Sequence, residues 1–243
     1  SIFAIFALFS AVPAWGDVSA GAGAGIAQFL LVGRGDRSAG MAGSFVPVAD
    51  DASAVFWNPA GLALVNGMDA QISHLAWMSN IKQYSGAFAA SLPGLFSLGA
   101  GAVYFDEGGI EGYGVDSSGD PVALGSFSNS DLAVSAGIAR TFALDGMEIS
   151  AGAGAKYVNV KLAQYSGATV AVDAGVLARE RTSGVSVGLS VLNAGGKIRL
   201  SSADEGLPMI VRSGVVFSGG DSFTLALEAD FQTGAFRLVR GGG

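Results

Sequence analysis

Segments in which large apolar residues alternate with small or polar ones recur along most of this 243-residue chain. In the stretch 147–157 every odd position is hydrophobic, and the even positions hold glycine, serine, Glu148 or Lys156. Successive side chains of a β-strand point to opposite faces, so this period of two predicts strands that are apolar on one face. The segments with this pattern are 83–92, 96–104, 131–138, 147–157, 169–176, 185–191 and 223–231, with weaker ones at 68–77 and 208–217.

The composition indicates which solvent the apolar face meets. Half of the residues are hydrophobic and 14% are charged, whereas soluble domains carry about 25% charged residues. In a soluble β-sandwich the second face would meet water and carry many charges, but here it is mostly glycine, serine and alanine. Segments of roughly ten alternating residues are typical of outer-membrane barrels. We therefore predict an all-β, antiparallel transmembrane β-barrel over a soluble sandwich, while autotransporter and adhesin barrels share the pattern.

A few charged residues interrupt the small-residue face of the predicted strands. In a barrel whose apolar face meets lipid, these side chains point into the lumen. The lumen-facing candidates are Asp131, Glu148, Lys156, Asp173, Arg212, Glu228 and Asp230. Tyr84, Tyr104 and Tyr157 lie at or near strand ends, where an aromatic girdle is expected.

Several classes of protein are excluded by residue counts. Glycine occupies 38 positions, and each one in a helix interior costs about 1 kcal/mol, which argues against a helical bundle. The chain has no cysteine and one histidine, His74, so neither a zinc site nor a catalytic triad can be assembled from the usual residues. The net charge of −7 disfavours nucleic acid, which needs basic clusters. We expect no enzymatic activity, no cofactor and no metal.

The first residues have the features of a signal peptide. An unbroken apolar run covers 2–9, and the small-residue pattern Ala14-Trp15-Gly16 precedes Asp17; the run is too short to span a bilayer as a helix. A cut after Ala14 is the alternative, and a short buried strand or helix is the competing interpretation. The chain starts at Ser1 without a methionine or a basic stretch, so we expect a fragment of an exported protein.

Two connections between predicted strands are long. Residues 106–127 are rich in glycine and acids and contain Asp120-Pro121, which predicts an external loop or lid. Residues 193–207 form the second long connection. Counting strands places both at the same end of the barrel.

The segment 37–64 carries the most specific pattern, because it fits neither a strand nor a long helix. It contains a small-residue helix start at 38–40, the paired acids Asp50 and Asp51, and the run Trp57-Asn58-Pro59-Ala60-Gly61. Asp51 or Ser53 is a suitable cap for a short helix that ends at Asn58, since the residue before a proline avoids helical angles. Adjacent residues on a strand point apart, so we do not expect Asp50 and Asp51 to act as an acid/base pair. The pattern predicts a structured plug.

These residues resemble a known family. The run 49–54 followed by Trp57-Asn58-Pro59-Ala60-Gly61 resembles the N-terminal signature of the PorV/PorQ outer-membrane proteins, which are similar to the FadL-type long-chain fatty acid transporters. Weaker matches are Val172-Asp173-Ala174-Gly175 and the segment from Val191-Leu192-Asn193-Ala194-Gly195 through Leu207-Pro208 to Arg212-Ser213-Gly214.

The resemblance implies a FadL-like barrel in the bacterial outer membrane, with an N-terminal hatch that contains Asp50, Asp51, Asn58, Pro59, Ala60 and Gly61. It implies one of two tasks: a type IX secretion accessory that binds a secreted cargo protein, or a conduit for hydrophobic small molecules such as long-chain fatty acids. A structural barrel or adhesin without transport is the further alternative. The expected partners are outer-membrane lipid and a hydrophobic molecule or cargo protein, and the hatch is expected to move when either binds.

The signal-peptide pattern and the resemblance together divide the chain. Residues 1–16 are expected to be a signal-peptide remnant, 17–66 the N-terminal segment with the hatch, and 67–243 the barrel strands. The chain ends at 240–243 without the final strands and terminal aromatic residue of such barrels, so the expected barrel is truncated at its C-terminus.

Overall fold

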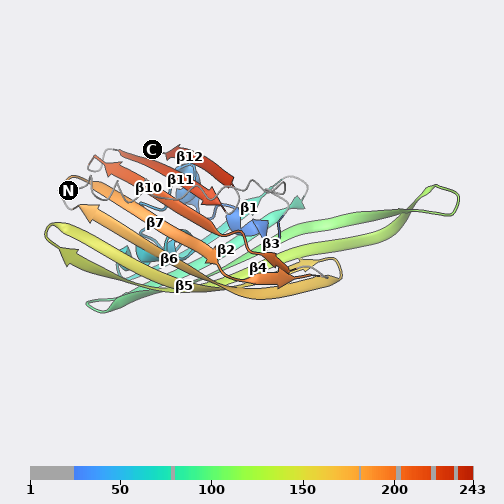
Figure 1. The fold of residues 1–243 in the computed structure, drawn as a ribbon, viewed down its shortest axis with the longest axis horizontal. Coiled ribbons are helices and arrows are strands. Elements are labelled where there is room, and N and C mark those ends of the chain that lie inside the picture. The colour runs from blue at the N-terminus through green and yellow to red at the C-terminus, as the bar shows by residue number, and fades with distance from the viewer. Residues whose placement is uncertain are drawn as a thin grey trace.

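The computed structural model describes residues 25–77, 80–180, 182–200, 204–219, 223–232 and 235–242. The predicted signal peptide lies outside these residues. The fold is all-β, and its main feature is a large antiparallel sheet that curls into a half-barrel (Figure 1). No helix among the described residues is both long and apolar enough to cross a membrane.

Ten strands form the curled sheet in the order β1-β2-β3-β4-β5-β6-β7-β10-β11-β12, and each pairs antiparallel with its neighbours. Their bounds are β1 Met68–Ala76, β2 Lys82–Leu92, β3 Phe96–Val115, β4 Pro121–Leu144, β5 Met147–Leu162, β6 Tyr165–Glu180, β7 Val185–Ala194, β10 Ile210–Ser218, β11 Thr224–Gln232 and β12 Ala235–Gly242. A small hairpin of β8 (Lys197–Arg199) and β9 (Asp204–Gly206) is inserted between β7 and β10. The strands thus form one curled sheet and not the two facing sheets of a sandwich. Among the described residues, no pairing joins the edge strands β1 and β12.

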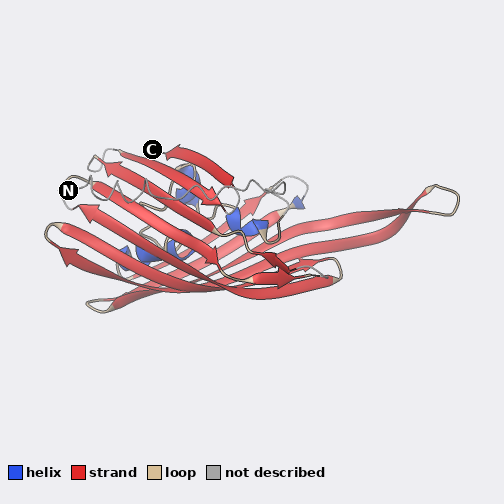
Figure 2. Ribbon diagram, in the orientation of Figure 1, coloured by secondary structure: helices blue, strands red, loops and turns tan. Residues whose placement is uncertain are grey.

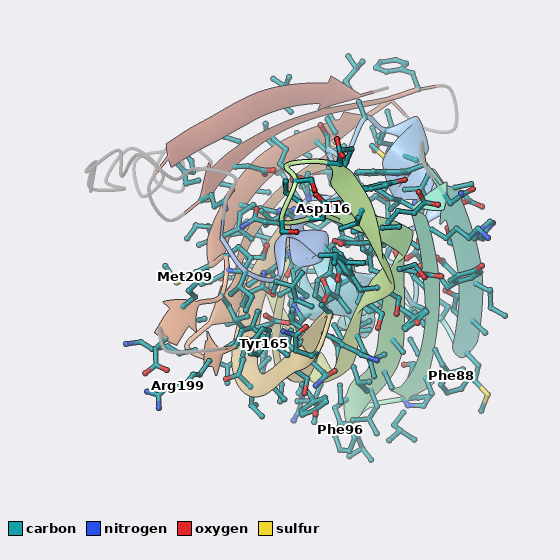
Figure 3. All side chains as sticks on the ribbon, turned by 90° about the vertical axis from the view of Figure 1, so that its right-hand side faces the viewer. Phe88, Phe96, Asp116, Tyr165, Arg199 and Met209 are labelled. Carbon is teal, nitrogen blue, oxygen red and sulfur yellow. The ribbon has the colours of Figure 1, made fainter. Side chains whose placement is uncertain are left out.

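The alternation predicted from the sequence is confirmed, because each of the nine predicted segments coincides with a strand. The two faces of the sheet differ sharply in exposure. On β6, Val170 and Val172 are 59% and 56% exposed on the convex face, whereas Ala171 and Asp173 are buried on the concave face. Figure 3 views the sheet end-on as an open arc, with Phe88 on its outer side.

The prediction of a loop or lid at 106–127 is wrong. Instead of a loop or lid, β3 and β4 continue as a twisted two-stranded arm that projects beyond the sheet (Figure 1). Only 116–120 forms the turn at its tip. The glycines that indicated a loop are accommodated within strands, where Gly108 and Gly125 adopt φ values of 71° and 94° at or near register shifts. The second long connection, between β7 and β10, holds the β8–β9 hairpin at the same end as the arm.

The N-terminal segment, residues 25–66, packs inside the curve of the sheet. It contains four short helices: η1 (Gln28–Leu31), α2 (Asp36–Gly40), α3 (Ala54–Trp57) and η2 (Pro59–Leu64). Figure 2 shows these helices enclosed by the strands. Phe45, Val55, Trp57 and Leu62 are buried in one core with residues from the concave face such as Val103. The segment therefore fills the half-barrel that the strands form.

Candidate functional site

Asp50 and Asp51 converge on a single arginine of the same segment. Arg37 Nη1 donates to Asp50 Oδ1 at 2.6 Å and to Asp51 Oδ2 at 2.7 Å. The other Asp51 oxygen accepts hydrogen bonds from the backbone N–H and the hydroxyl of Ser53, at 2.9 Å and 2.6 Å. Ser53 thus occupies the predicted cap position of α3, but its hydroxyl is bound to Asp51 rather than to the helix. These carboxylates are held as partners of a fixed cation and stabilise the fold of the segment.

Asn58 connects the segment to the wall of the half-barrel. It ends α3, as predicted, and its Oδ1 accepts from the N–H of Ala60 at 3.1 Å, which caps η2. Its Nδ2 donates to the carbonyl of Val46 at 3.1 Å and to that of Val176 on β6 at 3.4 Å. The Asn58 side chain is fully buried, so an amide is required here to satisfy donors and acceptors on both sides.

Glycines on the concave face give the segment its close fit to the strands. A Cβ at Gly152 on β5 would collide with the backbone of Pro59 and Ala60, and one at Gly175 on β6 would collide with Asn58. Within the segment, Gly61 lies directly against the carbonyl of Ala49 in the same way. The motif Asn58-Pro59-Ala60-Gly61 therefore packs backbone against backbone where two neighbouring strands have no side chain.

Five of the predicted lumen-facing charges lie buried on the concave face. Lys156 Nζ is 3.0 Å from Asp173 Oδ2 and donates to Asn193 Oδ1 at 2.6 Å, and the Asn193 N–H donates to Asp173 Oδ1 at 2.7 Å. Arg212 Nε lies 3.8 Å from Asp230 Oδ1, and Glu228 Oε2 accepts from the N–H of Val46 at 2.8 Å. These charges compensate one another and bind the N-terminal segment. Asp131 and Glu148 are only partly buried, nearer the two ends of the half-barrel.

Arginines of the segment and the wall enclose Trp57. The Arg212 guanidinium lies 4.5 Å from the ring centroid of Trp57, and the indole N–H donates to the carbonyl of Arg34 at 2.9 Å. Arg34 is buried and donates to the carbonyl of Phe29 at 3.0 Å. Burial and the nearby Arg212 lower the pKa of Arg34 to about 10, which still leaves it charged at neutral pH.

A cavity of about 700 Å³ opens at the arm end of the half-barrel, between the start of the N-terminal segment and strands β3 to β5. Its apolar lining includes Phe29, Val32, Trp77, Phe105 and Val160. The charged residues at its edge are Glu107, Asp131, Lys161 and Glu205.

A second cavity, of about 510 Å³, lies at the opposite end beside Arg37, Asp50 and Arg179. The body of the N-terminal segment occupies the space between the two cavities. The cavity at the arm end, closed below by the segment, is the candidate functional site and is called the arm-end pocket.

Part of this arrangement was predictable from the sequence. Asp131, which lines the arm-end pocket, and the motif Asn58-Pro59-Ala60-Gly61 below it were both among the predicted site residues. Glu107 was not, because it lay in the predicted loop. Arg34 and Arg37 were not, because their hydrogen-bond partners are distant in sequence or belong to the backbone. The aromatic residues Phe29, Trp77 and Phe105 carry no motif, and only the fold brings them together. No group of residues suited to a metal ion occurs in the described parts of the chain.

Comparison with known proteins adds no family to these observations, since no family model and no curated protein matches the chain.

Proposed function

We propose that this chain forms the wall and plug of an outer-membrane β-barrel of the PorV/PorQ type that takes up hydrophobic small molecules. The arm-end pocket carries the proposal. Its volume of about 700 Å³ lies within the range of small-molecule sites, about 300–1,000 Å³. Aliphatic and aromatic side chains make up most of its lining, and the polar and charged residues lie at its edge.

The convex face supports a membrane location. Large apolar side chains stand exposed on it along most strands, among them Phe88, Leu98, Val134, Ile138 and Leu225. Water-soluble proteins rarely expose contiguous apolar surface of this extent. β2 and β7 have 11 and 10 residues, and a tilted strand of about 9–11 residues crosses a bilayer. A lipid environment in the proposed barrel would cover these exposed apolar side chains.

The buried plug supports a gated path rather than an open pore. The N-terminal segment separates the arm-end pocket from the second cavity beside Arg37. In the proposed mechanism a hydrophobic molecule enters the arm-end pocket, and the segment then moves to release it. The pocket size favours a small molecule over a secreted cargo protein, which is the other task that the resemblance implies.

Uptake of a neutral apolar dye tests this function. Cells with the chain in their outer membrane should accumulate N-phenylnaphthylamine faster than cells without it. Ile81 lines the arm-end pocket, so Ile81→Trp should fill the entrance and return uptake to background. Ile72 is 91% exposed on the convex face, and Ile72→Trp is the matched control that should keep the uptake rate.

Equal uptake in all four strains would contradict the proposal. Recovery of the chain from a fraction other than the outer membrane would also contradict it. Loss of uptake in both Ile81→Trp and Ile72→Trp would show that any added tryptophan blocks uptake, and it would contradict a specific role of the pocket.

A further inference from the structure

The charged side chains around the arm-end pocket are predominantly acidic. Glu107 and Asp131 extend from β3 and β4, and Glu205 lies on β9. Among the described residues that line the pocket, Lys161 is the only basic one, and it belongs to the outward row of β5 with Tyr157 and Asn159. Its backbone N–H, rather than its ammonium group, is bound to Asp131. The charged groups directed at the pocket are therefore carboxylates.

The side-chain amide of Asn129, next to these acids, does not provide a free donor. Asn129 Nδ2 donates to Glu107 Oε2 at 2.9 Å, and its Oδ1 accepts from the N–H of Ala163 at 3.1 Å. Asn129 is 6% exposed, so this pair of bonds holds the Glu107 carboxylate in place. Gln28 also lines the pocket, and its amide carries both a donor and an acceptor. The charged part of the polar edge thus offers carboxylate oxygens to a ligand, and a carboxylate ligand would meet like charge.

Aromatic side chains line the pocket beside these acids. The rings of Phe29 and Phe105 have centroids 6.2 Å apart, and Trp77 meets Phe105 edge-on at 6.3 Å. Aromatic faces attract cations as well as apolar chains. Acids and aromatic rings together form a suitable environment for an ammonium group attached to a hydrocarbon.

The arm formed by β3 and β4 also carries negative charge, beyond the pocket itself. Between Gln83 and Ala139 the charged residues are Asp106, Glu107, Glu111, Asp116, Asp120 and Asp131, with no lysine, arginine or histidine. A surface of one sign raises the local concentration of oppositely charged ligands and speeds their association. The entrance is consequently biased toward cations.

We infer that the arm-end pocket binds amphiphiles with a cationic head group, such as long-chain alkylamines, in preference to fatty acids. This inference rests on the proposed function, since it names the ligand class of the same pocket. The ammonium group lies between the carboxylates of Glu107 and Asp131, and the alkyl chain lies along the apolar wall near Phe29 and Val32. A carboxylate head in this position is repelled by both acids.

Binding of three ligands with the same chain length tests the inference. The 243-residue protein is placed in phosphatidylcholine nanodiscs, and brominated dodecylamine, dodecanol and dodecanoate are titrated while tryptophan fluorescence is followed at pH 8. We expect quenching by the amine at a concentration at least about tenfold lower than by the alcohol, and weaker quenching still by dodecanoate. Trp77→Phe should remove the quenching, which locates the ligand in the arm-end pocket.

Two variants and a control separate the pocket charge from the net charge of the protein. Glu107→Gln and Asp131→Asn should each reduce the preference for amine over alcohol severalfold and leave the affinity for dodecanol unchanged. Glu111 lies on the exposed arm outside the pocket, and Glu111→Gln removes the same single charge. It should retain the full preference.

The outcomes distinguish this inference from the proposed function. If none of the three ligands quenches Trp77, the hydrophobic pocket itself is refuted, and the proposed function fails with it. If dodecanol binds and the amine binds no tighter, or if dodecanoate binds as well as the amine, only the inference is overturned. An equal loss of preference in Glu111→Gln would also overturn it, because the attraction would then come from net charge.

Discussion

The concave and convex faces of the sheet are built from the same strands yet meet different surroundings. On β5, Lys156 is 3% exposed and forms an ion pair beneath the N-terminal segment, whereas the adjacent Tyr157 is 45% exposed on the outside. Glycine, serine and charged groups line the inside, where backbone and polar partners are available. Large apolar groups occupy the outside, where the described residues provide no covering protein layer.

The composition of the concave face follows from what it contacts in the structure. The inner face requires small residues because the segment approaches to within backbone contact, as at Gly152 and Gly175. The outer face carries large exposed apolar side chains, which lipid would cover in the proposed membrane location. A substitution should therefore have opposite consequences on the two faces, and the predictions below use matched substitutions to test that.

Removal of the buried cation should have the largest effect. Lys156→Met leaves Asp173 without its ion-pair partner at a buried position, and breaking a buried pair in this way costs about 3–5 kcal/mol. Lys161→Met removes the same group from an exposed position and should change the free energy of unfolding by less than about 0.5 kcal/mol. Urea unfolding of both variants in lipid measures the difference, and equal values would contradict the buried role.

A charge placed on the convex face should have the next largest effect. Ala136 lies exposed in the middle of β4, and Ala136→Arg should cost about 2–4 kcal/mol if that position faces the centre of the bilayer. Ala123→Arg makes the same change in the arm portion of β4, where water is expected, and should be nearly neutral. Comparison of their folding midpoints in lipid vesicles measures this, and a neutral Ala136→Arg would mean that the convex face is wet.

A single methyl group on the concave face should have a smaller but measurable effect. Gly152→Ala forces the added Cβ into the backbone of Pro59 and Ala60, and such overpacking costs about 1–3 kcal/mol. Gly109 on the arm has open space at its Cβ position, so Gly109→Ala is the control. Protease sensitivity of the N-terminal segment should rise for Gly152→Ala alone. Identical cleavage of the two variants would argue against close packing of the segment.

The smallest effect is expected at an exposed ion pair of the β8–β9 hairpin. Two hydrogen bonds from Arg199, at 2.6 Å and 2.7 Å, lower the pKa of the Asp204 carboxyl below its ordinary value. The contribution of this pair to stability is present above the unfolded-state pKa and is lost as the pH falls through the lower folded-state pKa. A carboxyl NMR titration should show Arg199→Gln moving the Asp204 pKa upward. An unchanged pKa would indicate that the pair does not persist in solution.

The strands were predictable from the sequence because their alternation is local. A period of two is visible within ten residues, and it placed Lys156, Asp173 and Val172 on the correct faces. The segment 106–127 was wrongly predicted as a loop, because glycine and Asp120-Pro121 are typical of turns. Only the pairing between β3 and β4 shows that both strands continue through it. The glycine at 108 is needed for the shift in register there, which local composition does not reveal.

The contacts of the candidate site were less predictable because they join residues distant in sequence. Asn58 was identified as a helix end, but its bond to Val176 spans 118 positions. Arg37 lies 13 and 14 positions from the acids that it binds. The arm-end pocket combines Phe29, Trp77, Phe105 and Val160 from four separate elements or connections. Such convergence depends on the curvature of the whole sheet.

The central claim is that lipid covers the convex face, and the most direct test measures which solvent reaches that face. Spin labels at Val170, Val172 and Val176 on β6, with a label at Ala123 as the reference for water, can be examined in phosphatidylcholine nanodiscs by power saturation. If the convex face meets lipid, the three β6 positions should collide frequently with oxygen and rarely with a water-soluble nickel chelate, and the label at Ala123 should show the reverse. Frequent collisions with the nickel chelate at all four positions would contradict a lipid-facing convex surface.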